Sequence, residues 1–231
     1  MEVVGVADAA EFLERAGGLL LADEARHNLI LGIAGTLRDT PHLYPEQRLW
    51  LVVDAGEVAG AAVRTPPFNL VLARPHDDSA LGALAAAIDP PLPGVTAALP
   101  EALTFAKAWE EATGATGEVR REQKIYALEQ LRAVEGVPGA ARPAREDDRP
   151  LLRTWLREFG REALGEPEQD EERTERLLDY RLSSRSAGFS IWEDGVPVSV
   201  AGFGGETPNG ARESAPSTRR RRCAGAGTAA P

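Results

Sequence analysis

Apolar and polar positions alternate most clearly over residues 189–212, FSIWEDGVPVSVAGFGGETPNGAR. Two alternating runs flank Asp194-Gly195, a pair that suits a two-residue hairpin turn. The second run carries valines at alternate positions and leads into three glycines, Gly202, Gly204 and Gly205. At such glycines the backbone can bend or approach a ligand closely. The pattern therefore predicts a hairpin whose second strand ends in a glycine-rich bend.

A second hairpin of this kind is predicted over residues 49–67. Val58-Ala59-Gly60 matches Val200-Ala201-Gly202, and Thr65-Pro66 matches Thr207-Pro208, each pair being 142 positions apart. If a repeat is overlooked, the fold of the whole chain is assigned wrongly, so these matches bear on the interpretation of the whole chain. They indicate that a helix–helix–hairpin unit occurs twice.

The N-terminal half shows helical spacing before its hairpin and mixed patterns after it. We expect a helix over residues 7–16, capped by Asp8 and ended by Gly17-Gly18, and a second helix over residues 19–38. His27, in the second helix, is expected to have a polar surface or packing role, because His42 and His76 show no metal-type spacing with it. Strands are expected at 48–54, 57–64, 69–73 and 95–99, and further helices at 79–88 and 101–113. Residues 118–131 are expected to form a long strand or one half of a hairpin.

The C-terminal half restarts the pattern after residues 134–143, a Gly/Pro-rich stretch typical of a linker. Asp147 or Asp148 is placed to cap a helix that runs through Phe159, and residues 171–184 form a second helix ahead of the hairpin. The acidic run at 166–175 is interpreted as a solvated helix start. The fold class is therefore mixed α/β, with domains at 1–133 and 144–212 and a tail at 213–231.

Composition narrows the class of protein. The formal net charge is −10 and the chain has one cysteine, which argues against a general nucleic-acid binder, a disulfide framework and a cysteine-based zinc site. No apolar run approaches the roughly 20 residues of a membrane span, and the N-terminus lacks the basic and apolar regions of a signal peptide. A cytoplasmic protein is the expectation.

The tail from residue 213, ESAPSTRRRRCAGAGTAAP, contains four consecutive arginines, Arg219 to Arg222. It can be interpreted as a disordered basic tail or as a contact for an anionic partner. We favour a third hypothesis, that the tail is a frameshift product. One set of synonymous codons for this tail, read two bases later, encodes VGPVYTPPEVRGRGYGG, which is a strand, a Pro-Pro turn and a glycine-rich loop.

The run IWEDGVPVSVAGFGGETPNGAR, preceded by two amphipathic helices, resembles the first half of a domain of the GNAT superfamily of N-acetyltransferases. The shifted reading RGRGYG fits the superfamily's Arg/Gln-x-x-Gly-x-Gly/Ala pattern. Residues 7–131 resemble a GNAT domain without its glycine-rich loop. The domain is called degenerate because residues 65–74, the counterpart region, have no such glycine pattern. The resemblance implies two GNAT-like domains, each with a mixed, mostly antiparallel sheet flanked by helices, the second one incomplete.

The resemblance also implies acetyl-CoA as the donor and a small-molecule or peptide amine as the acceptor. In the family, a glycine-rich turn at a helix N-terminus cradles the pyrophosphate. Gly225 and Gly227 resemble that turn only in composition, so neither cofactor-binding nor catalytic residues are assigned. Glu193, Asp194 and Glu206 are carboxylates near the expected cleft, where a turn or surface role is the simpler interpretation of each.

The sequence leaves two other functions open. One is a non-catalytic interaction module whose basic tail binds an acidic partner, and the other is a small-ligand sensor built on the N-terminal domain. The chain contains no Gly-x-Ser-x-Gly elbow, Walker loop or His-Glu-x-x-His helix.

The frameshift hypothesis predicts a specific result on resequencing the gene beyond the codon for Arg212. We expect a corrected frame that continues through the RGRGYG loop. A confirmed frame ending at Pro231 would contradict the hypothesis and make the arginine cluster the feature to test.

Overall fold

A computed structural model describes residues 1–132, 135–163 and 170–213. The chain divides by its internal contacts into two units. Unit 1 comprises Met1–Leu131 together with Gly205–Arg212, and unit 2 contains Arg132–Gly204. The two units are described separately below.

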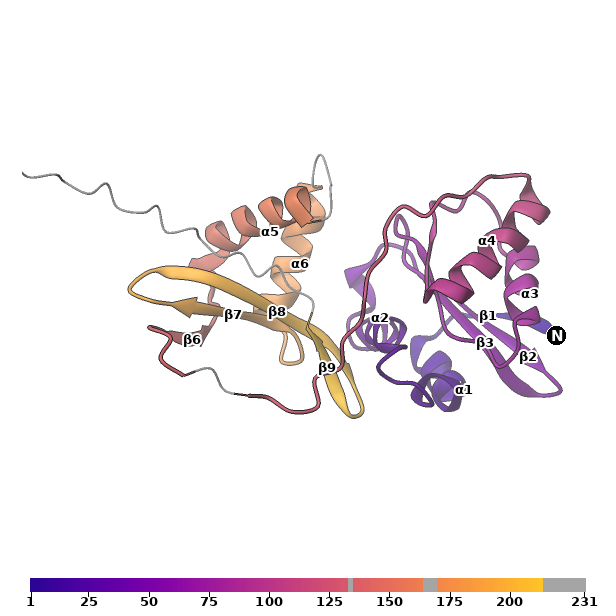
Figure 1. The fold of residues 1–231 in the computed structure, drawn as a ribbon, viewed down its shortest axis with the longest axis horizontal. Coiled ribbons are helices and arrows are strands. Elements are labelled where there is room, and N and C mark those ends of the chain that lie inside the picture. The colour runs from indigo at the N-terminus through magenta and orange to yellow at the C-terminus, as the bar shows by residue number, and fades with distance from the viewer. Residues whose placement is uncertain (133–134, 164–169, 214–231) are drawn as a thin grey trace, which may run out of the picture. The chain divides into compact units, whose positions relative to one another are not determined.

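Unit 1 contains a five-stranded sheet in the order β1-β2-β3-β4-β5 (Figure 1). The strands are β1 (Glu2–Val6), β2 (Arg48–Asp54), β3 (Glu57–Arg64), β4 (Leu70–Leu72) and β5 (Val95–Thr96). Neighbours from β1 to β4 run antiparallel, whereas β4 and β5 run parallel. The sheet therefore changes from antiparallel to parallel at its β4–β5 edge.

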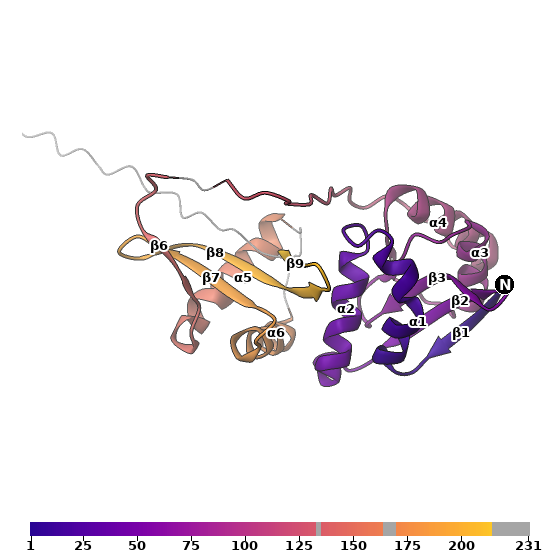
Figure 2. The same ribbon diagram turned by 90° about the horizontal axis from the view of Figure 1, so that it is seen from below.

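Helices cover both faces of this sheet (Figures 1 and 2). Along β2, Leu49 and Leu51 pack with α1 (Ala9–Leu21) and α2 (Asn28–Asp39). The alternate residues Trp50 and Val52 pack instead with α3 (Ser79–Ala87) and α4 (Leu99–Thr113). Because successive strand residues point to opposite faces, both alternating sets of apolar residues are buried. A short 3₁₀ helix, η1 (Pro41–Leu43), lies between α2 and β2.

The predicted hairpin at β2–β3 is confirmed with the same bounds, 48–54 and 57–64. Its turn residues Ala55 and Gly56 have φ angles of 50° and 90°, the left-handed values that a tight hairpin turn requires. Helices α3 and α4 are likewise confirmed, and Gly114 ends α4 with a φ of 72°.

The predicted break at Gly17-Gly18 is wrong. Helix α1 continues through both glycines to Leu21, and the chain breaks at residues 22–27 instead. Each glycine costs about 1 kcal/mol in a helix interior, but the helix carries Leu19 and Leu20 into the core, where both are buried. Burying a leucine contributes about 2 kcal/mol, so packing outweighs propensity. The cap at Asp8 is confirmed, since its carboxylate accepts from the N–H groups of Ala10 and Glu11.

Three further strand assignments differ from expectation. The strand predicted over residues 118–131 does not form: this segment contains neither helix nor strand. Strand β1, which the sequence analysis missed, pairs with β2 along its whole length. Strand β5 is shorter than expected, with two residues rather than five. Short strands depend on their neighbours for pairing, and sequence alone does not reveal those neighbours.

Unit 2 is built around a sheet in the order β6-β7-β8-β9. The strands are β6 (Ala140–Pro143), β7 (Gly188–Glu193), β8 (Pro197–Thr207) and β9 (Gly210–Glu213), the last lying beyond the contact boundary at Gly204. The last four residues of the predicted linker thus form β6. The predicted helices are confirmed as α5 (Arg149–Ala163) and α6 (Glu171–Ser183), preceded by a 3₁₀ turn, η2 (Glu146–Asp148).

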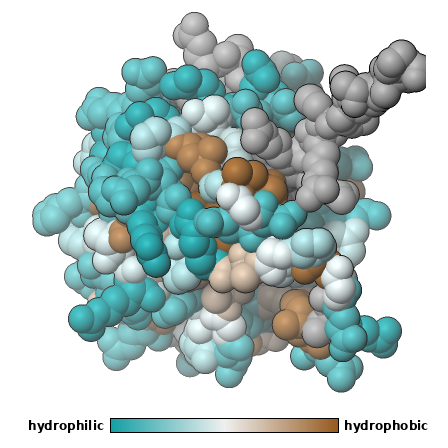
Figure 3. Space-filling view, turned by 90° about the vertical axis from the view of Figure 1, so that its left-hand side faces the viewer, coloured by the Kyte–Doolittle hydropathy of each residue, from teal (hydrophilic) through white to brown (hydrophobic). Residues whose placement is uncertain are grey.

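Helices α5 and α6 pack on one face of this sheet. Leu152 and Leu178, one from each helix, share a core with the strand residues Phe189 and Ile191. Residues that point to the other face, Ser190 and Trp192 among them, are only half-buried. Figure 3, which looks at unit 2, shows a group of hydrophobic residues within a largely hydrophilic surface.

The element order strand–helix–helix–strand–strand–strand occurs in both units, with the strands in sequential order in each sheet. The predicted repeat of helix, helix and hairpin is therefore present in the structure. Among the described residues, none of the helices is both long and apolar enough to span a membrane.

The sequence match that suggested the repeat does not join equivalent positions. Gly60 lies opposite Val52 on the α3 side, where an added Cβ would be 3.2 Å from that of Ala80. Gly202 instead lies opposite Phe189, which points toward α5 and α6. The hairpin turns at Gly56 and Gly195 are 139 positions apart rather than 142. Val58 lies two residues after Gly56, whereas Val200 lies five residues after Gly195, so the matched motif is three residues farther from its turn in β8 than in β3.

We expect unit 2 to unfold before unit 1. Its core cluster contains 7 buried residues, against 16 and 11 in the two clusters of unit 1, counted over the described residues. Ile191→Ala should lower the free energy of unfolding of unit 2 by about 2–5 kcal/mol. In differential scanning calorimetry it should therefore lower the temperature of the first transition only. Leu51→Ala, its matched control in unit 1, should lower only the second. A single transition that both substitutions shift equally would contradict this expectation.

Candidate functional site

The turn between β4 and α3, residues 73–78, joins a strand to a helix N-terminus beside the parallel β4–β5 edge. A turn in this setting can bind a phosphate if its backbone N–H groups are available. Here the Ala73 N–H donates to the Ala61 carbonyl and the His76 N–H to the Ala59 carbonyl, each at 2.9 Å. The turn therefore continues to bond with β3, and these amides are already used.

The side chain of His27 accepts a hydrogen bond from the N–H of Arg74, another amide of this turn. Its Nε2 lies 2.9 Å from the N–H of Arg74, and its Nδ1 lies 2.8 Å from the carbonyl of Leu20. The arrangement requires a hydrogen on Nδ1 and a lone pair on Nε2, which is one neutral tautomer. The ring is buried and joins the end of α1 to the turn. The predicted packing role of His27 is thus confirmed, and a surface position is excluded.

The N-terminus of α3 is occupied by a carboxylate of the same turn. Asp77 accepts from the N–H of Ser79 at 2.8 Å and also from its hydroxyl. These hydrogen bonds from Ser79 hold the pKa of Asp77 below its usual range. A charged Asp77 therefore takes the place that a bound anion would have at a helix N-terminus. The turn combines used amides with a negative charge, which opposes phosphate binding.

The predicted carboxylates of the C-terminal hairpin, Glu193, Asp194 and Glu206, do not form one cluster. Glu193 pairs with Arg142, whose guanidinium also binds Asp148 through two hydrogen bonds of 2.7 and 2.8 Å. Asp194 lies in the hairpin turn, where its N–H donates to the Val196 carbonyl. Glu206 is exposed near the far end of β8. Since the β7 residue Glu193 lies opposite Pro197, about 30 Å of strand separates it from Glu206 at 3.3 Å per residue.

The Arg142 cluster fixes the start of unit 2. Asp148 accepts from the Arg145 N–H at 2.8 Å as well as from Arg142. The Arg142 hydrogen bonds are the largest cause that holds the pKa of Asp148 below its usual range. Arg142 is on β6, Glu193 on β7, and Asp148 ends η2. The cluster therefore connects two strands to the entry of α5, and its members already satisfy one another.

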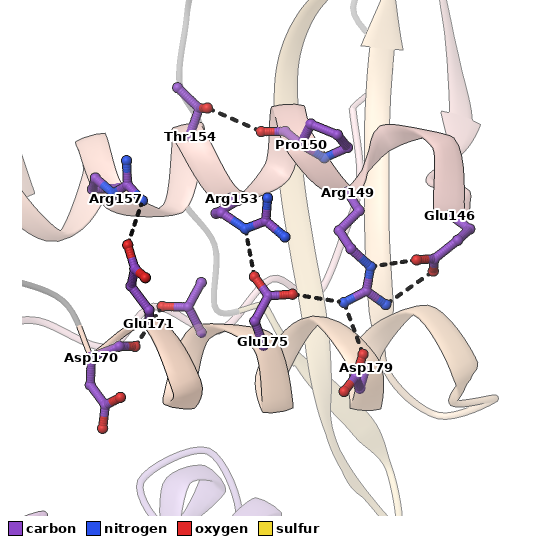
Figure 4. A network of polar contacts seen from close by, with 11 residues as sticks. Glu146, Arg149, Pro150, Arg153, Thr154, Arg157, Asp170, Glu171, Glu175 and Asp179 are labelled. Atoms are coloured by element: carbon purple, nitrogen blue, oxygen red, sulfur yellow. Dashed lines mark hydrogen bonds and ion pairs between the residues drawn. The ribbon is translucent and has the colours of Figure 1, made fainter.

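A second polar network joins α5 to α6 (Figure 4). Arg149 contacts Glu146 in its own segment, and it reaches Glu175 at 3.1 Å and Asp179 at 2.8 Å on α6. Arg153 binds the other oxygen of Glu175. These contacts, that of Glu146 first, raise the pKa of Arg149. The pKa of Glu175 is lowered, and the hydrogen bond from Arg153 is the largest cause of that shift. The network holds the two helices together and leaves little bonding capacity for a ligand.

Sequence reasoning missed this network, although a signal was present. Arg149, Arg153 and Arg157 recur every four residues, as do Glu171, Glu175 and Asp179. Residues four apart share one helix face, so two stripes of opposite charge were predictable. The part of the acidic run within α6 is therefore paired with arginines rather than only solvated.

Other predicted positions fall into three groups. Over the described residues, no three His, Cys, Asp or Glu side chains are arranged to hold a metal ion. Gly205, in the glycine-rich end of β8, has a φ of 64° and marks the expected bend. Arg219 to Arg222, Gly225 and Gly227 lie outside the described residues.

Comparisons with family models, curated proteins and solved structures give no match to this chain. The functional argument therefore depends on the chain's own sequence and geometry.

Asp148→Asn should destabilise unit 2 at pH 7, because it removes a charge that accepts from Arg142 and the Arg145 amide. We expect a loss of about 1–2 kcal/mol in the free energy of unfolding. The lowered pKa means that the folded state binds this proton less tightly than the unfolded state. The contribution is complete above the ordinary pKa of about 3.9 and is lost as the pH falls through the folded-state value.

Denaturant unfolding of the wild type and the variant should therefore differ at pH 7, and the difference should begin to shrink as the pH falls below about 4. Asp147→Asn, at the exposed neighbouring carboxylate, is the control and should have little effect. A difference between wild type and Asp148→Asn that does not change with pH would contradict the charge-based role.

Proposed function

We propose that this chain is a two-domain protein of the GNAT N-acetyltransferase type whose acetyl transfer from acetyl-CoA to a primary amine is impaired. The observation that carries the proposal is the recurrence of strand–helix–helix–strand–strand–strand in both units. The switch from antiparallel to parallel pairing at β4–β5 in unit 1 supports it as well. In the proposed scheme, the diverging ends of this strand pair are where a thioester donor lies beside the acceptor amine.

Acetyl transfer depends on three things that a protein of this type supplies. It positions the amine against the thioester, it donates hydrogen bonds to the tetrahedral oxyanion, and it accepts the amine proton. Positioning requires a cradle for the pyrophosphate of acetyl-CoA. In unit 1 the turn that would form this cradle uses the Ala73, Arg74 and His76 amides internally and presents Asp77.

Unit 2 offers no substitute within the described residues. The segment equivalent to the β4–α3 turn would follow β9, and residues 214–231 lie outside the described part of the chain. Glu193, one of the carboxylates expected near the cleft, is paired with Arg142. The guanidinium of Arg142 therefore occupies one of the two carboxylate oxygens of Glu193. We therefore assign no catalytic residue and propose a chain related to an acetyltransferase rather than an efficient one.

Isothermal titration calorimetry with acetyl-CoA tests this proposal directly. We expect no saturable heat, because the turn amides are used and Asp77 repels the phosphates. Asp77→Asn removes the charge but keeps a side-chain oxygen that can accept from Ser79, and it should remain inactive in binding, since the amides of residues 73, 74 and 76 stay bonded. An intact acetyltransferase of this type serves as the positive control.

Micromolar binding of acetyl-CoA by the unaltered chain would contradict the proposed impairment. Binding gained only on Asp77→Asn would show that the charge, rather than the used amides, prevents acetyl-CoA from binding at this turn. A thiol-release assay with a panel of small amines then decides whether any bound acetyl-CoA is turned over.

A further inference from the structure

The segment between α1 and α2, residues 22–27, contacts both helix layers of unit 1. The Nη2 atom of Arg26 lies 2.6 and 2.7 Å from the two carboxylate oxygens of Glu101, in the first turn of α4. Helices α1 and α2 cover one face of the sheet, and α4 covers the other. The Arg26–Glu101 ion pair therefore connects one helix layer to the other.

This connection lies at the carboxyl ends of β4 and β5. The last residue pair that the two strands share joins Val71 to Thr96. Beyond it the chain after β4 stays with β3, whereas the chain after β5 turns into α4. Glu101 follows β5 by five residues, and Arg74, whose N–H binds His27, follows β4 by two. Residues 26 and 27 thus hold both chains where they separate.

One short closed turn carries both contacts. The N–H of His27 donates to the Asp23 carbonyl at 3.0 Å, and the N–H of Arg26 donates to the Asp23 carboxylate at 3.3 Å. The His27 ring bonds to the Leu20 carbonyl at the end of α1, and the His27 carbonyl accepts from Leu31 in α2. Because the turn is this short, we expect a shift that breaks the Arg26 contact to break the His27 contact as well.

The ion pair is the contact with the greatest effect on this segment. The Glu101 side chain is only 7% exposed, whereas that of Arg26 is 29% exposed. A buried carboxylate that loses its partner is strongly unfavourable. Glu101 therefore holds Arg26 in place, and Arg26 can turn toward water only where that carboxylate is absent or bound otherwise.

We propose that residues 22–27 form an autoinhibitory strap across the carboxyl ends of β4 and β5, held by the Arg26–Glu101 ion pair. The inference rests on the proposed function, which places the thioester donor at these strand ends. While the strap is in place, it bridges the separating chains and its His27 uses the Arg74 N–H. Release of the ion pair opens the strand ends and makes that N–H available to a phosphate oxygen of acetyl-CoA.

Hydrogen exchange of the full chain, followed by NMR without acetyl-CoA, tests the strap itself. Glu101→Met breaks the ion pair and leaves no buried charge unpaired, and methionine is a good helix former. The Arg74 amide should exchange about tenfold faster or more than in the wild type, because its acceptor moves away. The Ala73 and His76 amides, which bond to β3, should change by less than about twofold.

Glu111→Met is the matched control, because it makes the same change at an exposed position of the same helix. It should leave the exchange of all three amides unaltered. Equal acceleration of the three amides by Glu101→Met would indicate a general loss of stability and would overturn the strap. An Arg74 amide that exchanges at the wild-type rate in Glu101→Met would overturn it too.

Calorimetry with acetyl-CoA tests the inhibitory role separately. Asp77→Asn/Glu101→Met should give a saturable binding heat, whereas Asp77→Asn/Glu111→Met, which has the same net charge, should give none. The same result for both double variants would overturn the inhibitory role. Micromolar binding by the wild type would contradict the proposed impairment, and the exchange comparison identifies a failure of the strap without reference to acetyl-CoA.

Discussion

An apolar face of a β-sheet must be covered, and this constraint governs how the chain is built. In unit 1, alternate residues of β2 point to different helix pairs, so Leu51 joins the α1–α2 core and Val52 the α3–α4 core. In unit 2, α5 and α6 bury Phe189 and Ile191, whereas Trp192 on the opposite face is half-buried. The same alternation of strand residues thus gives one unit two buried layers and the other a single one. Stability follows buried apolar area, so the units differ in strength although they share an element order.

Where helices cover a sheet closely, the connecting backbone has few amides left for a ligand. The turn that leads from β4 to α3 shows this directly. Continued pairing with β3 uses the amides of Ala73 and His76, and packing of α1 brings His27 against Arg74. These contacts stabilise unit 1, and they also remove the donors that phosphate binding requires. In this turn, the interactions that hold the fold and those that would bind acetyl-CoA compete for the same N–H groups.

Local signals were sufficient for turns, caps and helix ends set by neighbouring residues, and insufficient for features that depend on distant parts of the chain. The Ala55-Gly56 turn, the Asp8 cap and the Gly114 stop depend on nearest neighbours, and each was predictable. The continuation of α1 through Gly17-Gly18 was not, because the buried leucines that outweigh the glycines are recognised only in the folded core. Pairing of β1 with β2 joins residues more than 40 positions apart. The arginine and carboxylate stripes of α5 and α6 were readable from four-residue spacing, but their contact needed the helix–helix geometry.

The repeat shows most clearly why a sequence match and a structural match differ. Side chains in a strand alternate with a period of two, so a difference of three residues moves a matched motif to the opposite face. Gly60 and Gly202 match in sequence, yet they face different helix layers. Counted from the hairpin turns, Ala61 corresponds to Val200, and both point to the layer formed by the first two helices of their unit. The two units are therefore related by element order and by the orientation of the core residues. Packing constrains these two properties. It does not constrain where a short Ala/Gly/Val triplet lies along a strand.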